Sequence, residues 1–279
     1  MLKQCLDRYN ETHDISITFA NTGQEDERTL DFVHAVDLNF CRPVGRKVVW
    51  IEAEAHEQGV GQSARIVTYE TASRDGKPFD DAVAKYGVFN TKYPNCTGRL
   101  KDEPIHSYLR SIGWKRGTYD TAIGIRADER IRISKDAEAK RFIYPLVEWG
   151  WRKRDVNKFM AQFEWDLKIP NDAYGNCVWC WKKSNRKLMT VAKSNPDVFD
   201  FPGKMERKHG MVNKGKDEMP EPRTFFRGNL SAQDIIKAAF TQRFAPYEDD
   251  TFDQAELFDE WLDAGGSCSS SCEIGADNL

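Results

Sequence analysis

Hydrophobic and polar positions change their spacing several times along the N-terminal part of the chain. Residues 1–11 have the spacing of an amphipathic helix, and residues 15–20 form a short, β-branched and half-apolar run typical of a buried strand. Helical spacing returns over residues 25–40, and residues 48–51 form another short apolar run. A helix between two buried strands is characteristic of a βαβ unit, so the sequence predicts an α/β protein with a parallel sheet.

The rest of the chain carries the same two patterns less regularly. Short strands are predicted over residues 66–69 and 118–125. Helices are predicted over residues 79–86, 100–112, 155–165 and 231–244. Residues 196–224 are rich in proline, glycine and charge, and they predict a loop or linker. We therefore expect an α/β domain over residues 1–190, followed by a mostly helical extension with a flexible, cysteine-containing tail over residues 191–279.

The composition indicates a soluble globular protein. Of 279 residues, 40% are hydrophobic and 30% are charged, and the net charge of −3 gives no support for a general nucleic-acid coat. No apolar run has the length of a membrane helix and no signal peptide is visible, so we expect a cytoplasmic protein without a membrane partner. Basic stretches at residues 152–154 and 182–187 could receive phosphate or sulfate, or could be solvated surface.

Polar residues that could contact a ligand follow two of the predicted strands. Thr22 and Gly23 follow the first strand, and the loop after strand 118–125 contains Arg126, Asp128 and Glu129. Ligands of open parallel sheets bind beyond the carboxyl ends of the strands, so we expect these two loops to converge. The two acidic residues could hold a magnesium ion or orient the arginine, and we favour the second role.

Seven cysteines in a reducing compartment indicate metal or redox chemistry rather than a disulfide framework. Cys177 and Cys180 form a C-x-x-C motif, whose sulfurs can bind one iron or zinc ion. A thioredoxin-like redox pair and two inert thiols are the alternatives, but the motif follows a loop rather than a strand of an early βαβ unit. Further ligands could come from Cys96, Cys268 and Cys272.

Three short segments resemble motifs of the phosphoadenylylsulfate (PAPS) and adenylylsulfate reductases. They are ANTGQE at residues 20–25, GIRADE at residues 124–129 and YPLVEW at residues 144–149. Their order and separations also fit that family, which belongs to the adenine nucleotide alpha-hydrolase-like (ATP pyrophosphatase) superfamily. The resemblance covers roughly residues 1–190. It implies a Rossmann-like parallel sheet, an adenine nucleotide as ligand and an oxidoreductase of sulfur metabolism.

The resemblance also assigns roles to the cysteines. Cluster-bearing members of the family have a Cys-Cys pair at a similar distance before a C-x-x-C motif, and here Cys96 precedes Cys177 by 81 positions. An iron–sulfur cluster of the 4Fe-4S type is therefore implied on Cys96, Cys177 and Cys180, with zinc as an alternative. The fourth ligand would be Cys268 or Cys272, or one iron would be open, as in several enzymes that thiolate tRNA.

The sequence departs from the family pattern in three places. Asn95 occupies the first position of the Cys-Cys pair. The family's first strand and phosphate-binding loop are expected to be absent, because the sequence starts inside the helix that follows them. The tail around Cys272 is only loosely similar to the segment that carries the family's nucleophile.

The resemblance leads to one main hypothesis, a reductase of an adenylylated sulfate. Thr22 and Gly23 would contact the nucleotide, Cys272 would attack the sulfur, and a thioredoxin-type reductant or glutathione would release sulfite. The anion would be held by Arg126, together with Arg99, Lys101 or Lys187.

Two alternatives stay open. The first is an ATP-dependent sulfur transferase with an open-iron cluster, which would thiolate a small molecule or a nucleic acid; a nucleic-acid partner is expected only in that case. The second is a non-enzymatic, metal-binding descendant with a dead nucleotide site. A homodimer is compatible with all three hypotheses.

Overall fold

The computed structural model describes residues 1–56, 61–213 and 221–248. Its main sheet has the strand order β1-β2-β3, with β1 (Ile17–Asn21), β2 (Val48–Ala55) and β3 (Gln62–Val67). β2 runs parallel to β1, and β3 runs antiparallel to β2. Because α2 (Glu27–Val36) connects the two parallel strands, the predicted βαβ unit and the mixed α/β class are confirmed.

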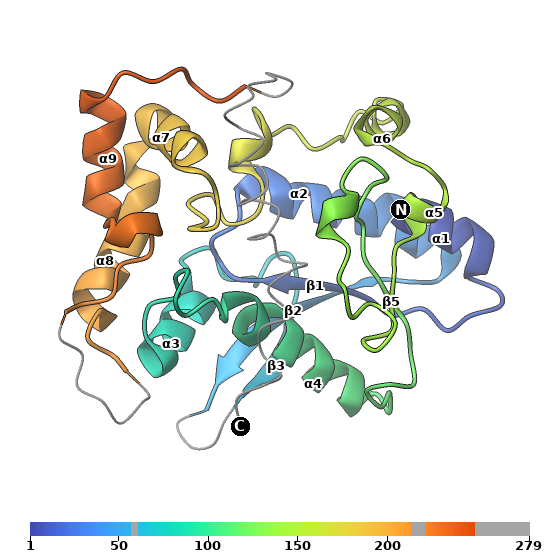
Figure 1. Cartoon of the computed structure of the whole chain (residues 1–279). Helices are drawn as coiled ribbons and strands as arrows, with labels where there is room; N and C mark the ends of the chain where they lie inside the picture. The colour runs from blue at the N-terminus through green and yellow to red at the C-terminus, as the bar shows by residue number, and fades with distance from the viewer. Residues whose placement is uncertain (57–60, 214–220, 249–279) are drawn as a thin grey trace.

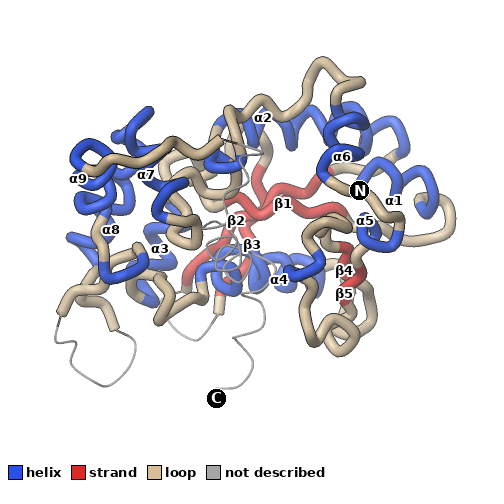
Figure 2. Tube along the Cα trace, turned by 45° about the horizontal axis from the view of Figure 1, so that its top comes forward, coloured by secondary structure: helices blue, strands red, loops and turns tan. Residues whose placement is uncertain are grey.

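Helices cover both faces of this sheet (Figures 1 and 2). On one face, Leu30 of α2 packs with Val48 and Trp50 of β2. On the other face, Ala53 of β2 packs in the same cluster as Phe79 of α3. These faces alternate along β2 because neighbouring side chains of a strand point in opposite directions. The helices that frame the sheet are α1 (Leu2–Tyr9), α2, α3 (Lys77–Tyr86) and α4 (Glu103–Ser111).

The two remaining strands form a separate small sheet. β4 (Thr121–Ala122) pairs in parallel with β5 (Phe142–Ile143), away from the three main strands (Figure 2). The prediction that residues 118–125 form a strand is thus correct only for two residues. The expectation that this strand ends at the same sheet edge as β1 is wrong, because its backbone bonds go to Arg141 and Ile143 instead.

The helices after the second sheet complete the hydrophobic core. They are α5 (Pro145–Glu148), α6 (Lys153–Met160), α7 (Asn185–Ser194), α8 (Asp200–His209) and α9 (Ala232–Thr241). α7 runs across residue 190, and Met205 and Ile235 of the following helices belong to the same buried cluster as Phe79 and Trp179. The C-terminal segment therefore shares one core with the sheet domain.

α8 lies inside the stretch that the sequence predicts to be a loop or linker, so that prediction is wrong there. Pro202 occupies the first turn of α8, where a backbone N–H has no partner within the helix and a proline is tolerated. Pro202 and Gly203 are both buried on this helix. The proline, glycine and charged residues of this stretch predict a loop, but packing against α3 and α9 stabilises a helix there.

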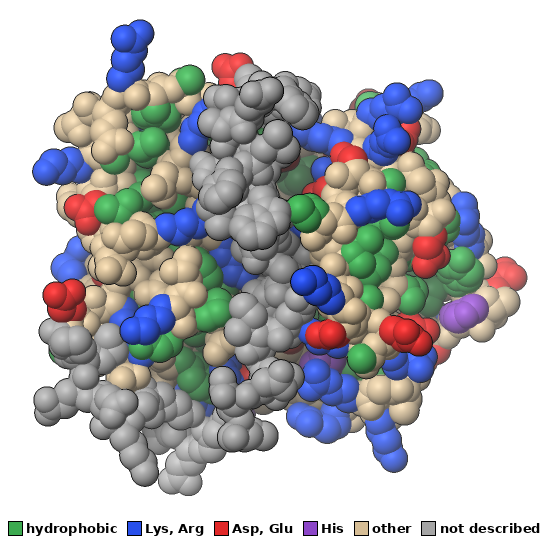
Figure 3. All heavy atoms as spheres, in the orientation of Figure 1, with side chains coloured by type: hydrophobic (Ala, Val, Ile, Leu, Met, Phe, Trp, Pro, Cys, Tyr) green, Lys and Arg blue, Asp and Glu red, His purple; other side chains and the backbone are tan. Residues whose placement is uncertain are grey.

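The described part of the chain contains no helix that is long and apolar enough to cross a membrane. On the face shown in Figure 3, side chains of both charge signs are scattered over the surface. This pattern agrees with the small net charge of −3.

Candidate functional site

The candidate site is built on the loop that follows β1. Asn21 and Thr22 are fully buried there, and Gly23 has a positive φ of 75°. The carboxylate of Glu25 accepts hydrogen bonds from the Thr22 backbone N–H at 3.0 Å and from the Thr22 hydroxyl at 2.9 Å. These bonds close the loop on itself and fix the direction of the Thr22 side chain.

The C-x-x-C motif lies against this loop. Val178 N–H donates to the carbonyl oxygen of Gln24 at 3.1 Å, and the indole N–H of Trp179 donates to the Gln24 side chain at 2.5 Å. The Thr22 hydroxyl lies 3.4 Å from Sγ of Cys177. A thiol that is 155 positions away in the sequence is thereby placed beside the residue that was expected to contact a nucleotide.

A buried lysine holds the backbone of the motif. Nζ of Lys183 donates to three carbonyl oxygens, those of Ala173 at 2.6 Å, Cys177 at 2.9 Å and Val178 at 2.8 Å. The Cys180 N–H also donates to the Cys177 carbonyl at 2.9 Å, which closes a turn between the two cysteines. The basic run after the motif, predicted as an anion site or solvated surface, thus contributes at least one structural lysine.

The segment around Cys96 is the third part of the site. Cys96 and Cys180 both pack against the buried cluster that contains Cys177. Nζ of Lys182 donates to the Thr97 hydroxyl at 3.3 Å. This bond connects the segment after the C-x-x-C motif to the start of the helical turn Gly98–Asp102. The three cysteines that the sequence grouped together therefore belong to, or pack against, one buried cluster.

Burial dominates the electrostatics of Cys177. Loss of solvation raises the pKa of its thiol well above the ordinary value, and the nearby charges of Glu25 and Cys180 raise it further. The positive charge of Lys101 and a hydrogen bond from Thr22 act in the opposite direction. The free thiol is thus protonated and unreactive, and it becomes a thiolate most readily when a metal ion replaces the proton.

The type of ligand atom favours a metal site at these thiols, whereas their spacing in the structure does not. Cysteine sulfurs are the soft ligands that iron–sulfur clusters and zinc prefer, and three of them belong to, or pack against, the same buried cluster. Within the described residues, however, no three Cys, His, Asp or Glu side chains are grouped closely enough to hold an ion. The turn brings Cys177 and Cys180 together, and Cys96 would have to approach them. Cys268 and Cys272 lie outside the described residues.

The other predicted anion-binding residues are placed differently. Lys101 is close enough to affect the Cys177 thiol. Arg99 instead stacks on the ring of Tyr86 at 4.3 Å and forms an ion pair with Glu103. Nζ of Lys187 lies 4.6 Å from the ring centre of Tyr247.

Arg126 belongs to the loop after β4 and pairs with its own neighbours. Its Nε lies 3.2 Å from the carboxylate of Asp128 and 3.4 Å from that of Glu129. The interpretation that these acids orient the arginine is supported by this geometry. The expectation that Arg126 and Thr22 converge at one sheet edge is not supported, because β4 belongs to the second sheet.

Sequence reasoning missed the buried network beneath the β1 loop. Glu52 of β2 is fully buried, and its carboxylate accepts from the Asn21 amide at 2.7 Å and from the Ser73 backbone N–H at 2.6 Å. Arg65 of β3 adds an ion pair at 2.5 Å. The Asn21 side chain in turn accepts from Gly23 N–H at 3.1 Å. A glutamate inside the apolar run of β2 was the available signal, because buried acids need partners.

Gly23 is predicted to be intolerant of any side chain. A Cβ added there would lie 2.9 Å from the backbone of Gly76, whereas a Cβ on Gly45, at the nearly identical φ of 73°, would meet nothing within 4 Å. Both substitutions place an alanine in the left-handed backbone region, which costs about 1 kcal/mol. We expect Gly23→Ala to lower the free energy of unfolding by about 2 kcal/mol more than Gly45→Ala, because of the clash. Urea unfolding of the two variants measures this difference, and equal losses would contradict the close approach.

Comparison with known proteins finds a relative that spans nearly the whole chain. The chain is similar to the uncharacterized nin region protein ORF290 of Escherichia phage lambda, with 33% identity over 268 residues that cover 94% of this chain and 86% of the relative. No protein-family model matches the chain. No solved structure matches it.

Proposed function

The chain belongs to the family of the nin region protein ORF290 of Escherichia phage lambda, and we propose that it is a nucleotide-dependent enzyme of sulfur metabolism, of the PAPS reductase type. In this proposal the α/β domain is a Rossmann-like relative of the adenine nucleotide alpha hydrolases. Cys96, Cys177 and Cys180 hold a 4Fe-4S cluster, with zinc as the alternative metal.

One observation carries the proposal. Three segments that are far apart in the sequence approach one another near the Cys177 thiol: the loop after β1, the segment that contains Thr97 and Lys101, and the C-x-x-C motif. The resemblance to PAPS reductases assigns the first segment to the nucleotide and the other two to the cluster. Their meeting is what that assignment requires.

The residues of this chain have distinct parts in the proposed reaction. The loop of Thr22 and Gly23 binds the nucleotide, and Lys101 offsets negative charge beside Cys177. Glu25 holds the Thr22 side chain in place through its carboxylate. A cluster, when bound, would supply a positively polarised surface or an open iron position for sulfur.

The group-transfer step would use Cys272, which lies outside the described residues. Its thiolate would attack the sulfur of an adenylylated sulfate, the sulfur–oxygen bond to the phosphate would break, and AMP or its 3′-phosphate would leave. The product would be a cysteine S-sulfonate. A dithiol of the thioredoxin type would then be oxidised to a disulfide and would release sulfite.

An ATP-dependent sulfur transferase is the second candidate. In this proposal three cysteines would be the ligands, with Asn95 beside Cys96 where the reductases have a fourth. Three ligands would leave one iron open to hold a substrate sulfur. In that case ATP would release pyrophosphate on addition of the acceptor, which would be a nucleic acid or a small molecule.

The test is metal analysis and activity of the anaerobically purified full chain. We expect iron and sulfide in equal amounts, a broad visible absorption band, and sulfite release from PAPS or adenylylsulfate with reduced thioredoxin. Iron without sulfite release but with pyrophosphate release from ATP would move the assignment to the transferase. Protein with zinc and no adenine nucleotide binding would be a non-enzymatic metal protein. Protein with neither iron nor zinc would refute the site.

A further inference from the structure

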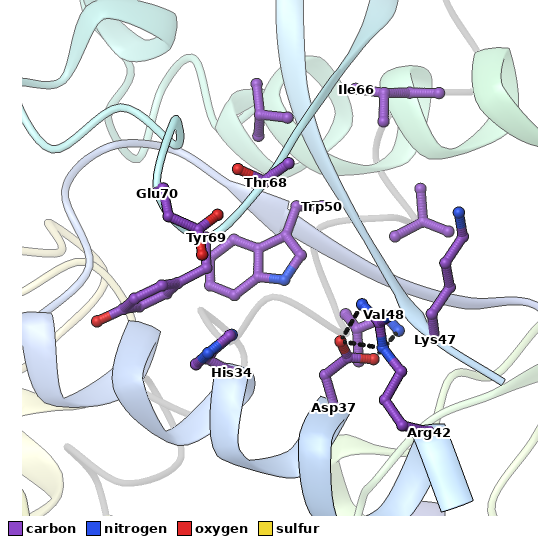
Figure 4. A pocket seen from close by; sticks show the side chains of 12 residues that line it. His34, Asp37, Arg42, Lys47, Val48, Trp50, Ile66, Thr68, Tyr69 and Glu70 are labelled. Atoms are coloured by element: carbon purple, nitrogen blue, oxygen red, sulfur yellow. Dashed lines mark hydrogen bonds and ion pairs between the residues drawn. The ribbon is translucent and has the colours of Figure 1, made fainter. Parts of the chain in front are cut away.

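Figure 4 shows a separate cavity of about 280 Å³. It lies near the start of β2, whereas the cysteine site lies beyond the end of β1. The cavity is bounded by α2, by the first residues of β2 and by the end of β3, with lining residues that include His34, Val48, Trp50, Val67 and Tyr69. Val48 starts β2, whereas Glu52 sits beside the β1 loop. Four residues along a strand correspond to roughly 13 Å, so this cavity and the cysteine site are distinct.

One side of the cavity is an aromatic wall. The rings of His34 and Tyr69 stack with their centres 4.3 Å apart and an angle of 16° between their planes. Tyr69 in turn meets Trp50 edge-on at 5.9 Å. The Tyr69 hydroxyl donates to the carboxylate of Asp31 at 2.5 Å, which fixes the ring orientation. Val48 and Val67 add aliphatic surface, so the cavity is largely apolar and can receive a flat ring.

The other end of the cavity carries positive charge. Asp37 is buried, and its carboxylate accepts from the Val48 N–H at 2.6 Å and from Arg42 Nε at 2.9 Å. The buried carboxylate thereby holds an otherwise exposed guanidinium at the rim. Lys47 stands beside it and forms no ion pair with any residue that the structure describes. The net charge at this end is therefore positive.

The negative charge at the cavity lies elsewhere. Glu70 lines the far side, near His34, and the hydroxyl of Thr68 lowers the pKa of its carboxyl by hydrogen bonding. Figure 4 shows Glu70 beside Tyr69, whereas Lys47 and Arg42 lie across the cavity beyond Trp50. The cavity is thus polarised, with an aromatic half and a cationic half.

We propose that this cavity binds a small planar aromatic anion, with its ring between the aromatic wall and the valine side chains and its acid group at Arg42 and Lys47. Pockets that bind small ligands combine an apolar, aromatic lining with a few polar groups that orient the ligand, and this cavity has both parts. Its volume suits one or two fused rings. The same chemistry is offered by an aromatic carboxylate and by a nucleoside monophosphate, and the experiment separates these two sources.

The experiment measures binding of indole-3-carboxylate and of AMP to the full chain by calorimetry. Val67 faces Trp50 across the strand pair, so Val67→Trp fills the cavity from the edge strand. We expect the wild type to bind indole-3-carboxylate at one site, Val67→Trp to weaken this binding by about tenfold or more, and Lys47→Glu to weaken it by about fivefold. Lys204→Glu, on α8, is the matched charge control and should leave it unchanged.

Competition identifies the natural type of ligand. If AMP displaces indole-3-carboxylate, the cavity accepts nucleotides; if AMP binds without displacing it, the cavity is specific for the carboxylate and the nucleotide occupies another site. Circular dichroism shows whether each variant is folded. If Val67→Trp does not fold, Lys47→Glu still tests the proposal. The proposal is overturned if neither probe binds the wild type, or if the two cavity variants bind as the wild type does. None of these outcomes depends on metal content.

Discussion

Cys177→Ser is expected to abolish the iron and sulfide content of anaerobically purified protein, together with its visible absorption. Cys177 is the most buried of the three proposed ligands and the one fixed by both Thr22 and the Cys177–Cys180 turn. A serine oxygen is a poor ligand for iron in a thiolate-bound cluster. Cys96→Ser and Cys180→Ser should also lower the iron and sulfide content. Iron and sulfide assays, normalised to protein, measure the loss.

The matched control is Cys5→Ser on α1. Cys5 is only partly buried, and the neighbouring Leu6 belongs to the other buried cluster, so the substitution of Cys5 should leave the metal content unchanged. Cys41 is a poorer control, because it is completely buried and burial raises the pKa of its thiol to about 11. Metal retained at the wild-type level in Cys177→Ser would show that the C-x-x-C motif is not part of a metal site.

Glu52→Ala is expected to lower the free energy of unfolding by about 3 kcal/mol, because it removes the common acceptor of a buried network. The Asn21 amide and the Ser73 N–H would lose their partner, and Arg65 would lose its ion pair. Arg65 is half exposed, so water compensates part of its loss. Urea unfolding followed by circular dichroism gives the value.

Glu54→Ala provides the comparison on the same face of the same strand. Glu54 is exposed and accepts a hydrogen bond from the Ser63 hydroxyl, so its loss should change stability by about 0.5 kcal/mol or less. Glu52→Gln should fall between the two, since an amide keeps one acceptor oxygen for Asn21 and Ser73 but cannot pair with Arg65. If Glu52→Ala were as mild as Glu54→Ala, the network would not support the β1 loop.

The elements with strong local patterns were predicted well from the sequence. The βαβ unit of β1, α2 and β2 has clear changes of hydrophobic period, and the structure confirms it. The segment predicted over residues 100–112 is a helix from Gly98 to Ser111 that begins with a wider π-helical turn. The arrangement of β4 with β5 was not predictable in the same way, because a two-residue ladder is selected by the surrounding chain rather than by its own pattern.

The residue types of the candidate site could be chosen from the sequence, whereas most of their contacts could not. Thr22 and Cys177 were both singled out, and the structure brings them within 3.4 Å. Arg99 and Lys187 were assigned to the anion under the reductase hypothesis, and in the structure each cation lies over an aromatic ring, that of Tyr86 or Tyr247. Long cationic side chains can reach several partners, so sequence position does not fix their direction. The roles of Glu25 and Glu52 arise from contacts with remote segments, which a single sequence does not reveal.

The lysine that binds three carbonyl oxygens has a consequence for the order of events during maturation. The ammonium group of Lys183 holds the C-x-x-C turn in its shape through bonds that require no metal. Part of the conformational entropy that a small metal-dependent domain loses on binding its ion is lost here when the chain folds. Under the proposed metal assignment, the protein should therefore reach its folded state first and bind the ion afterwards, and loss of the ion should empty the site without unfolding the chain.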